Sequence, residues 1–99
     1  MPYIQKLRRK LYDKVVNKLA KKIVTVNVDN CSTFAGDLNY ILTTLFLKVY
    51  HKENPAQINY DSYNEIIGVL ECCKMEFYRR YTVPYEQQKI DTNGDVELD

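Results

Sequence analysis

The chain has 99 residues, of which 45% are hydrophobic and 27% charged, and a formal net charge of +1. A chain of this length forms one domain with a modest core, because folding buries only about 60–65% of its surface. It has no run of the roughly 18 apolar residues that a membrane span needs, and no apolar segment follows its basic N-terminus as a secretory signal requires. These features predict one domain over residues 1–99, in the cytoplasm and without a membrane partner.

Charge is distributed unevenly along the chain. Residues 1–24 carry eight lysines and arginines against Asp13 alone, a net charge of +7, whereas residues 91–99 carry four carboxylates and no basic residue, a net charge of −4. One interpretation is a solvated basic helix face with a solubilising acidic tail. The other is that the tail folds back on the helix, or that the helix faces an anionic ligand.

The first predicted helix spans residues 3–23, where apolar residues recur three and four positions apart. They are Ile4, Leu7, Leu11, Val15, Leu19 and Ile23. Valines then alternate with polar residues over 24–28, which is typical of a strand, and a loop follows within 24–35. A short strand here that pairs with Val96 and Leu98 of the tail is one possibility, although a two-stranded ribbon alone is marginal.

The second and third predicted helices span residues 37–51 and 62–83. Asp37 is the expected N-cap of the second, whose nearly continuous apolar surface is typical of a central helix or of one shared with a subunit interface. Ser62 and Glu65 form a capping-box pattern at the start of the third. The apolar stripe of the third helix is Tyr63, Ile66, Leu70, Cys73, Phe77 and Tyr81.

Pro84 is expected to end the third helix or to start a short one over 84–90, followed by a tail over 91–99. The predicted fold is therefore all-α, a small three-helix unit with an extended C-terminal arm. Because small chains often supplement their cores by association, the fold is expected to be homo-oligomeric.

Catalytic and metal-binding constellations are largely missing from the sequence, and although carboxylates are common, none is distinguished as an acid–base pair. The one histidine, His51, lies where a helix C-terminus favours a cation, and Cys72-Cys73 lacks the further ligands that a zinc site needs. No glycine-rich phosphate loop is present. Three cysteines without framework spacing indicate reduced thiols. The sequence predicts no enzyme, no catalytic residue, no metal site and no cofactor.

Binding chemistry is better represented, because the chain has nine tyrosines and no tryptophan. Tyrosine faces stack on bases, and arginine forks bind phosphate at two points. The segment 68–86 brings both kinds of side chain together. Its candidate ligand-binding residues are Lys74, Tyr78, Arg79, Arg80 and Tyr85. The alternative is that the tyrosines pack in a core or interface and that the arginines bind Glu76 or the acidic tail.

A second candidate cluster is Asp37-Leu38-Asn39-Tyr40, at the expected start of the second helix. The first turn of a helix offers free N–H groups to anions, and the amide of Asn39 can read the edge of a base. Ordinary helix capping explains the same residues without a ligand.

Four segments in order, Gly36–Tyr40, Gly68–Arg80, Pro84–Glu86 and Asn93–Val96, together with the start Met1–Ile4, resemble a widespread family of small phage-encoded proteins whose function is unknown. The resemblance covers most of the chain. Residues 24–34 stand apart from it, as an insertion would.

This family in turn resembles the phage anti-CBASS sponge proteins, which sequester cyclic nucleotide signals of bacterial immunity. The resemblance implies a helical dimer or tetramer in the infected bacterial cell that binds a cyclic dinucleotide, such as 3′,3′-cGAMP, between subunits without cleaving it. The side-chain chemistry then gives Tyr78 and Tyr85 a stacking role on the bases. Lys74, Arg79 and Arg80 would hold the phosphates, and Asn39 and Tyr40 would read base edges.

Two other functions fit the same sequence. A host-takeover protein would bind a host protein through its basic first helix and its apolar second helix. A nucleic-acid-binding accessory protein would use the basic first helix, and its binding would weaken steeply with salt as counterions are released.

Overall fold

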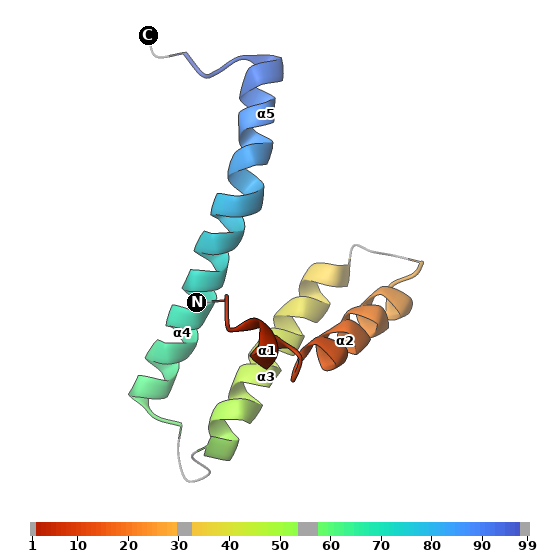
Figure 1. Ribbon diagram of the computed structural model, residues 1–99, viewed down its shortest axis with the longest axis vertical. Coiled ribbons are helices and arrows are strands. Elements are labelled where there is room, and N and C mark those ends of the chain that lie inside the picture. Colours follow the sequence, from red (N-terminus) through yellow and green to blue (C-terminus); the bar gives the residue numbers. More distant parts are fainter. Residues whose placement is uncertain (1, 30–32, 54–57, 98–99) are drawn as a thin grey trace. The chain divides into compact units, whose positions relative to one another are not determined.

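A computed structural model describes residues 2–29, 33–53 and 58–97 and confirms that the chain is all-α (Figure 1). Its helices are α1 (Lys6–Arg9), α2 (Asp13–Val26), α3 (Phe34–Glu53), α4 (Tyr60–Phe77), the π-helical η2 (Tyr78–Thr82) and α5 (Val83–Asn93). The described ranges contain no strand. Contacts divide the chain into an N-terminal unit, residues 3–63, and a C-terminal unit, residues 64–99 together with residues 1–2.

The first predicted helix is interrupted, so the prediction of one helix over 3–23 is wrong. A turn at residues 10–12 separates α1 from α2. The backbone N–H of Leu11 donates to the carbonyl of Arg8 at 3.1 Å, and that of Tyr12 donates to Arg9 at 3.0 Å. These bonds reach back three residues rather than four, which tightens the helix and ends it. The apolar periodicity continues across the turn and therefore does not reveal it.

The strand predicted over residues 24–28 is also wrong, because α2 continues to Val26. Thr25 is accommodated in the helix by a hydrogen bond from its hydroxyl to the carbonyl of Lys21, at 2.7 Å. The low helix propensity of β-branched residues costs only tenths of a kcal/mol each, which the backbone ladder overrides. Of the two tail residues proposed to pair here, Val96 lies outside any strand, and Leu98 lies beyond the described residues.

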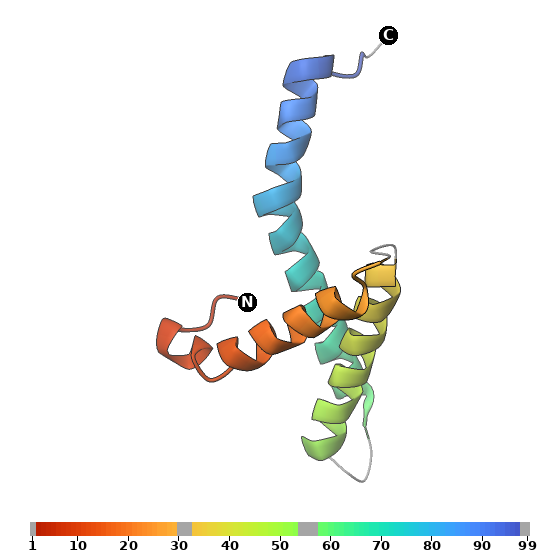
Figure 2. The ribbon, with the colours of Figure 1, turned by 90° about the vertical axis from the view of Figure 1, so that its right-hand side faces the viewer.

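Asn27 joins the end of α2 to the beginning of α3. Its side chain, only 6% exposed, donates 2.8 Å hydrogen bonds to the carbonyl of Ile23 and to Oδ2 of Asp37. Figure 2 shows this end of α2 meeting the start of α3. Because α3 begins at Phe34, Asp37 lies inside the helix. The prediction that Asp37 is the N-cap of this helix is therefore wrong. The Asp37 carboxylate instead accepts the bond that connects the two helices.

Replacing Asn27 with alanine is expected to lower the free energy of unfolding by about 1–2 kcal/mol. The substitution removes the amide that donates to the carbonyl of Ile23 and to the carboxylate of Asp37, so both acceptors lose this hydrogen bond. Urea denaturation followed by far-UV circular dichroism measures this change. Asn17→Ala, on the exposed surface of the same helix, serves as the control and should change stability by less than about 0.5 kcal/mol. Equal effects of the two substitutions would contradict the role of Asn27.

Asn59, rather than Ser62, caps α4. The Oδ1 atom of Asn59 accepts hydrogen bonds from the backbone N–H of Ser62 at 3.0 Å and from its hydroxyl at 3.1 Å. The helix therefore begins at Tyr60, two residues before the predicted start at residue 62. The capping-box pattern of Ser62 and Glu65 is wrong as an N-terminus, because a better cap precedes it.

The helical backbone runs without interruption from α4 through η2 into α5, and these three elements are called the C-terminal rod (Tyr60–Asn93) below (Figure 1). The predicted break at Pro84 is replaced by a π turn. The N–H of Val83 donates to the carbonyl of Tyr78, five residues back. Proline offers no N–H and its ring crowds the carbonyl four residues earlier. A wider turn avoids both problems, so the chain stays helical.

The C-terminal rod also extends beyond the predicted short helix over 84–90. It ends at Gly94, whose N–H donates to the carbonyl of Ile90 at 2.8 Å. Gly94 has a φ of 88°, which a residue without a Cβ adopts at little cost. The predicted tail over 91–99 is therefore helical in its first three residues.

The apolar faces of the helices remain largely uncovered. No hydrophobic side chain is buried among the residues that the structure describes, and Phe77 is 64% exposed. None of the described helices has both the length and the apolar character needed to cross a bilayer. The amphipathic stripes that the sequence predicts are thus present as exposed helix faces.

Candidate ligand-binding site

An open groove of about 460 Å³ runs along the C-terminal rod at the end of α4 and across η2. It is lined by Glu71, Lys74, Met75, Tyr78, Arg79 and Val83. Three of the candidate residues from the sequence, Lys74, Tyr78 and Arg79, are therefore on one surface. The spacing explains this for the α4 residues, because positions three and four apart lie on the same side of a helix.

Carboxylates on the same helix hold both cations of the groove. The Nζ atom of Lys74 lies 3.4 Å from Oε1 of Glu71, and the guanidinium of Arg79 donates two hydrogen bonds to Glu76, one of them from Nε to Oε2 at 3.4 Å. The side chains of Lys74 and Arg79 are 73% and 70% exposed. Ion pairs this exposed contribute less than about 1 kcal/mol. A phosphate can therefore compete with these carboxylates for the two cations.

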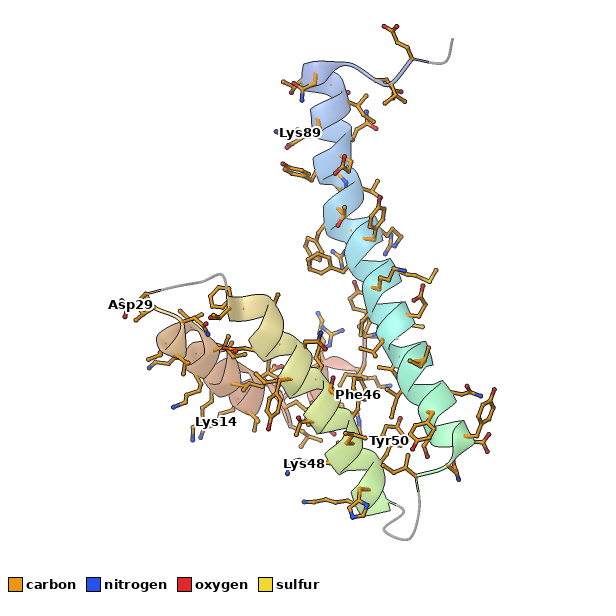
Figure 3. The ribbon with its side chains drawn as sticks, turned by 180° about the vertical axis from the view of Figure 1, so that it is seen from behind. Lys14, Asp29, Phe46, Lys48, Tyr50 and Lys89 are labelled. Carbon is orange, nitrogen blue, oxygen red and sulfur yellow. The ribbon has the colours of Figure 1, made fainter. Side chains whose placement is uncertain are left out.

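Arg80 and Tyr85 lie outside the lining of the groove. The guanidinium carbon of Arg80 is 6.0 Å from the ring centroid of Tyr81, while Nζ of Lys89 is 5.4 Å from the ring centroid of Tyr85. Figure 3 shows Lys89 projecting from α5. Sequence reasoning missed Lys89, although its spacing of four residues from Tyr85 places the two on one helix face.

Asn39 and Tyr40 lie in the N-terminal unit. Because α3 begins at Phe34, both residues are in its second turn, beyond the free N–H groups of a helix start. This corrects the prediction that they flank an anion site at a helix N-terminus. Tyr40 borders a smaller groove between α2 and α3, of about 200 Å³, and Asn39 does not. The residues lining this groove are Leu19, Lys22, Ile23, Val26, Asp37, Tyr40 and Ile41.

The basic residues of α2 form a separate surface. Lys18, Lys21 and Lys22 border a shallow hollow of about 620 Å³ together with Val15, Leu19 and Thr25. Figure 3 shows Lys14 projecting from the same helix, away from α3. This surface combines positive charge with an apolar edge but contains no aromatic ring.

The described residues contain no candidate metal site, and the two cysteines among them are free thiols. Within the ranges 2–29, 33–53 and 58–97, no three histidine, cysteine or acidic side chains are grouped so that they could hold a metal ion. Cys72 and Cys73 are exposed free thiols. Cys31 lies outside the described residues.

Comparison with known proteins identifies the family of the chain. Residues 1–96 match the family described as Domain of unknown function (DUF6899). The chain belongs to the DUF6899 family. No curated protein and no solved structure matches it. The DUF6899 match spans every helix from α1 to α5, so both grooves lie within the family domain.

The groove on the rod brings aromatic, basic and apolar side chains of this DUF6899 chain together on one surface. Tyr78 supplies an aromatic face, and Lys74 and Arg79 supply positive charge beside it. Met75 and Val83 add an apolar surface. Together these groups suit a ligand that is flat on one side and anionic at its edges. The groove is open, so it offers binding from one side only.

Proposed function

We propose that this chain binds and sequesters a cyclic dinucleotide, such as 3′,3′-cGAMP, without cleaving it, as a phage protein of immune evasion. One observation carries the proposal, the groove in which Tyr78 lies with Lys74 and Arg79. The groove has a volume of about 460 Å³ and is open to solvent, and all of its lining residues come from the C-terminal rod.

One base, the phosphates and the sugar of such a ligand have counterparts in the groove. A base stacked on Tyr78 contributes about 1–3 kcal/mol. Arg79 presents a planar fork that matches the geometry of a phosphate, whereas Lys74 acts as a mobile point charge. Met75 and Val83 provide apolar contact for the sugar and for the edge of the base.

Sequestration requires binding alone. A protein that holds a messenger tightly lowers its free concentration by mass action, and the host effector then stays unoccupied. The groups that line the groove bind and orient a ligand, and the proposal assigns no bond-breaking role to any of them.

Isothermal titration of the purified protein with cyclic di- and trinucleotides, 3′,3′-cGAMP first, tests the proposal. We expect heat of binding with at least one member of the panel, and recovery of the intact ligand after the protein is denatured. Linear dinucleotides of the same bases are the control for ring-specific recognition. Recovery of a hydrolysed ligand would contradict sequestration, and the absence of heat with every member would remove the proposed function.

A further inference from the structure

Three exposed aromatic side chains of the C-terminal rod have no part in the ligand groove. Phe77, Tyr81 and Tyr85 are 64%, 60% and 55% exposed, and none of them lines the groove described above. Because they follow one another at intervals of four residues, they lie on one side of the helix. These three residues, together with Arg80 and Lys89, are called the aromatic strip below.

The π turn helps to keep the three rings in line. In a regular α-helix a step of four residues overshoots a full turn by about 40°, so a row of rings drifts around the helix. The π turn is closed by a bond from Val83 to Tyr78, five residues back, and a step of four within this wider turn falls short of a full turn. The ring centroids of Phe77 and Tyr81 are 5.1 Å apart, with their planes inclined at 43°.

Cations lie beside two of the rings. The guanidinium carbon of Arg80 is 6.0 Å from the ring centroid of Tyr81, and Nζ of Lys89 is 5.4 Å from that of Tyr85. All four basic and all four aromatic residues of segment 64–99 fall within positions 74–89. That stretch contains two carboxylates, a net charge of +2, whereas the rest of the segment contains six carboxylates and no basic residue. The aromatic strip is therefore a local positive region in an acidic unit.

A surface of this kind suits a polymer that alternates planar groups with anions. Single-stranded nucleic acid has both, because its bases stack on aromatic side chains while its phosphates pair with cations beside them. Rings four residues apart are separated by about 6 Å along the helix axis, so neighbouring rings can meet neighbouring bases of an extended strand. A duplex keeps its bases stacked on one another and offers the strip only its phosphates.

Other occupants match the aromatic strip less well. Residues 3–63 contain ten lysines and arginines against five carboxylates, a net charge of +5, so the N-terminal unit repels the cations of the strip. The acidic tail over 91–99 of another copy would pair with these cations, but it has no aromatic residue to stack on the rings. An apolar protein surface would cover the rings and desolvate the cations without pairing them.

We propose that the aromatic strip binds single-stranded nucleic acid without sequence preference. The bases stack on Phe77, Tyr81 and Tyr85, and the phosphates pair with Arg80 and Lys89. This activity goes beyond the proposed function, because it uses side chains outside the ligand groove and takes a polymer rather than a cyclic dinucleotide. It does not require the groove to bind anything.

Fluorescence anisotropy of a labelled oligothymidylate of about 12 nucleotides, titrated with the full chain, tests the proposal. We expect binding at low salt that weakens as salt is raised, because phosphate contacts release counterions. A duplex of the same length serves as a second probe, since it reports contacts to phosphate alone, including those of the α2 lysines. The absence of oligothymidylate binding at low salt would overturn the proposal.

Removing two rings separates stacking from charge. Tyr81→Leu/Tyr85→Leu keeps an apolar side chain and a good helix former at both positions. It is expected to weaken oligothymidylate binding about tenfold or more and to leave duplex binding unchanged. Tyr60→Leu, which removes an exposed ring at the start of the rod, should leave both affinities unchanged. Undiminished oligothymidylate binding by the double variant would show that the strand lies elsewhere and would overturn the proposal.

Two further variants test the phosphate contacts and the choice of surface. Lys89→Gln is expected to reduce the slope of log affinity against log salt by about 0.7, as for one phosphate contact on a single strand, whereas Lys48→Gln on α3 should not change it. Tyr78→Leu, in the groove, should leave oligothymidylate affinity unchanged. If it costs as much as Tyr81→Leu/Tyr85→Leu, the strand occupies the groove and the proposal of a separate surface is wrong. Circular dichroism of each variant reports helix content independently.

Discussion

Replacing Arg79 with alanine is expected to weaken binding of a cyclic dinucleotide by about 10- to 100-fold. The substitution removes a charge-assisted contact to phosphate, and hydrogen bonds to charged groups contribute about 1.5–3 kcal/mol. Isothermal titration measures the loss. Because Arg79 is 70% exposed and bound to Glu76, the fold is expected to keep its helix content.

Arg80→Ala is the matched control for this prediction. Its guanidinium lies over the ring of Tyr81 and does not line the groove, so the affinity should fall much less than with Arg79→Ala. If Arg80→Ala costs as much as Arg79→Ala, the ligand uses a different surface of the C-terminal rod. If neither substitution changes the affinity, the groove is not the site.

Replacing Pro84 with alanine is expected to stabilise the C-terminal rod by about 1–3 kcal/mol and to weaken ligand binding at the same time. Alanine supplies the missing N–H and removes the ring that crowds the preceding turn. The π turn can then relax to an α turn. A π turn contains one residue more than an α turn. Its relaxation to an α turn therefore rotates α5 by about 100° relative to α4. Val83 would leave the groove that it now lines with Tyr78 and Arg79.

Urea denaturation and titration of the same Pro84→Ala sample measure the two effects together. Pro2→Ala is the control, because Pro2 precedes α1 and interrupts no helix. A gain in stability with unchanged affinity would show that the register after the π turn does not matter to the site. A loss of stability would show that the wide turn has another cause than proline.

Helix type and helix faces were predictable from the sequence because hydrophobic periodicity reports them directly. The stripe from Tyr63 to Tyr81 follows a regular 3–4 spacing, and the structure places these residues on helices. Helix ends were less predictable, because they depend on single hydrogen bonds. Asn59 caps α4 in place of Ser62, and Asn27 ends α2 within the run of alternating valines that suggested a strand.

The candidate site was predictable to the extent that an ideal helix describes it. Lys74, Tyr78 and Arg79 share a surface because α4 is regular up to Phe77. Val83 lies on the same surface only because of the π turn, which the hydrophobic periodicity does not predict. Asn39 and Tyr40 were assigned from an assumed start of α3 at Asp37, and the earlier start at Phe34 changes their place in the helix.

Under the proposed function, recognition in this groove would be an exchange of anions, because carboxylates already hold Lys74 and Arg79. Glu71 and Glu76 are the anions paired with these two cations in the structure. The two cations are therefore oriented before a ligand arrives, which reduces the ordering cost of binding. The exchange favours a ligand that delivers two negative charges at once, because a single charge gains little over the carboxylate it displaces. The proposed function therefore predicts selectivity for doubly charged over singly charged nucleotides, as a consequence of the protein's own acidic side chains.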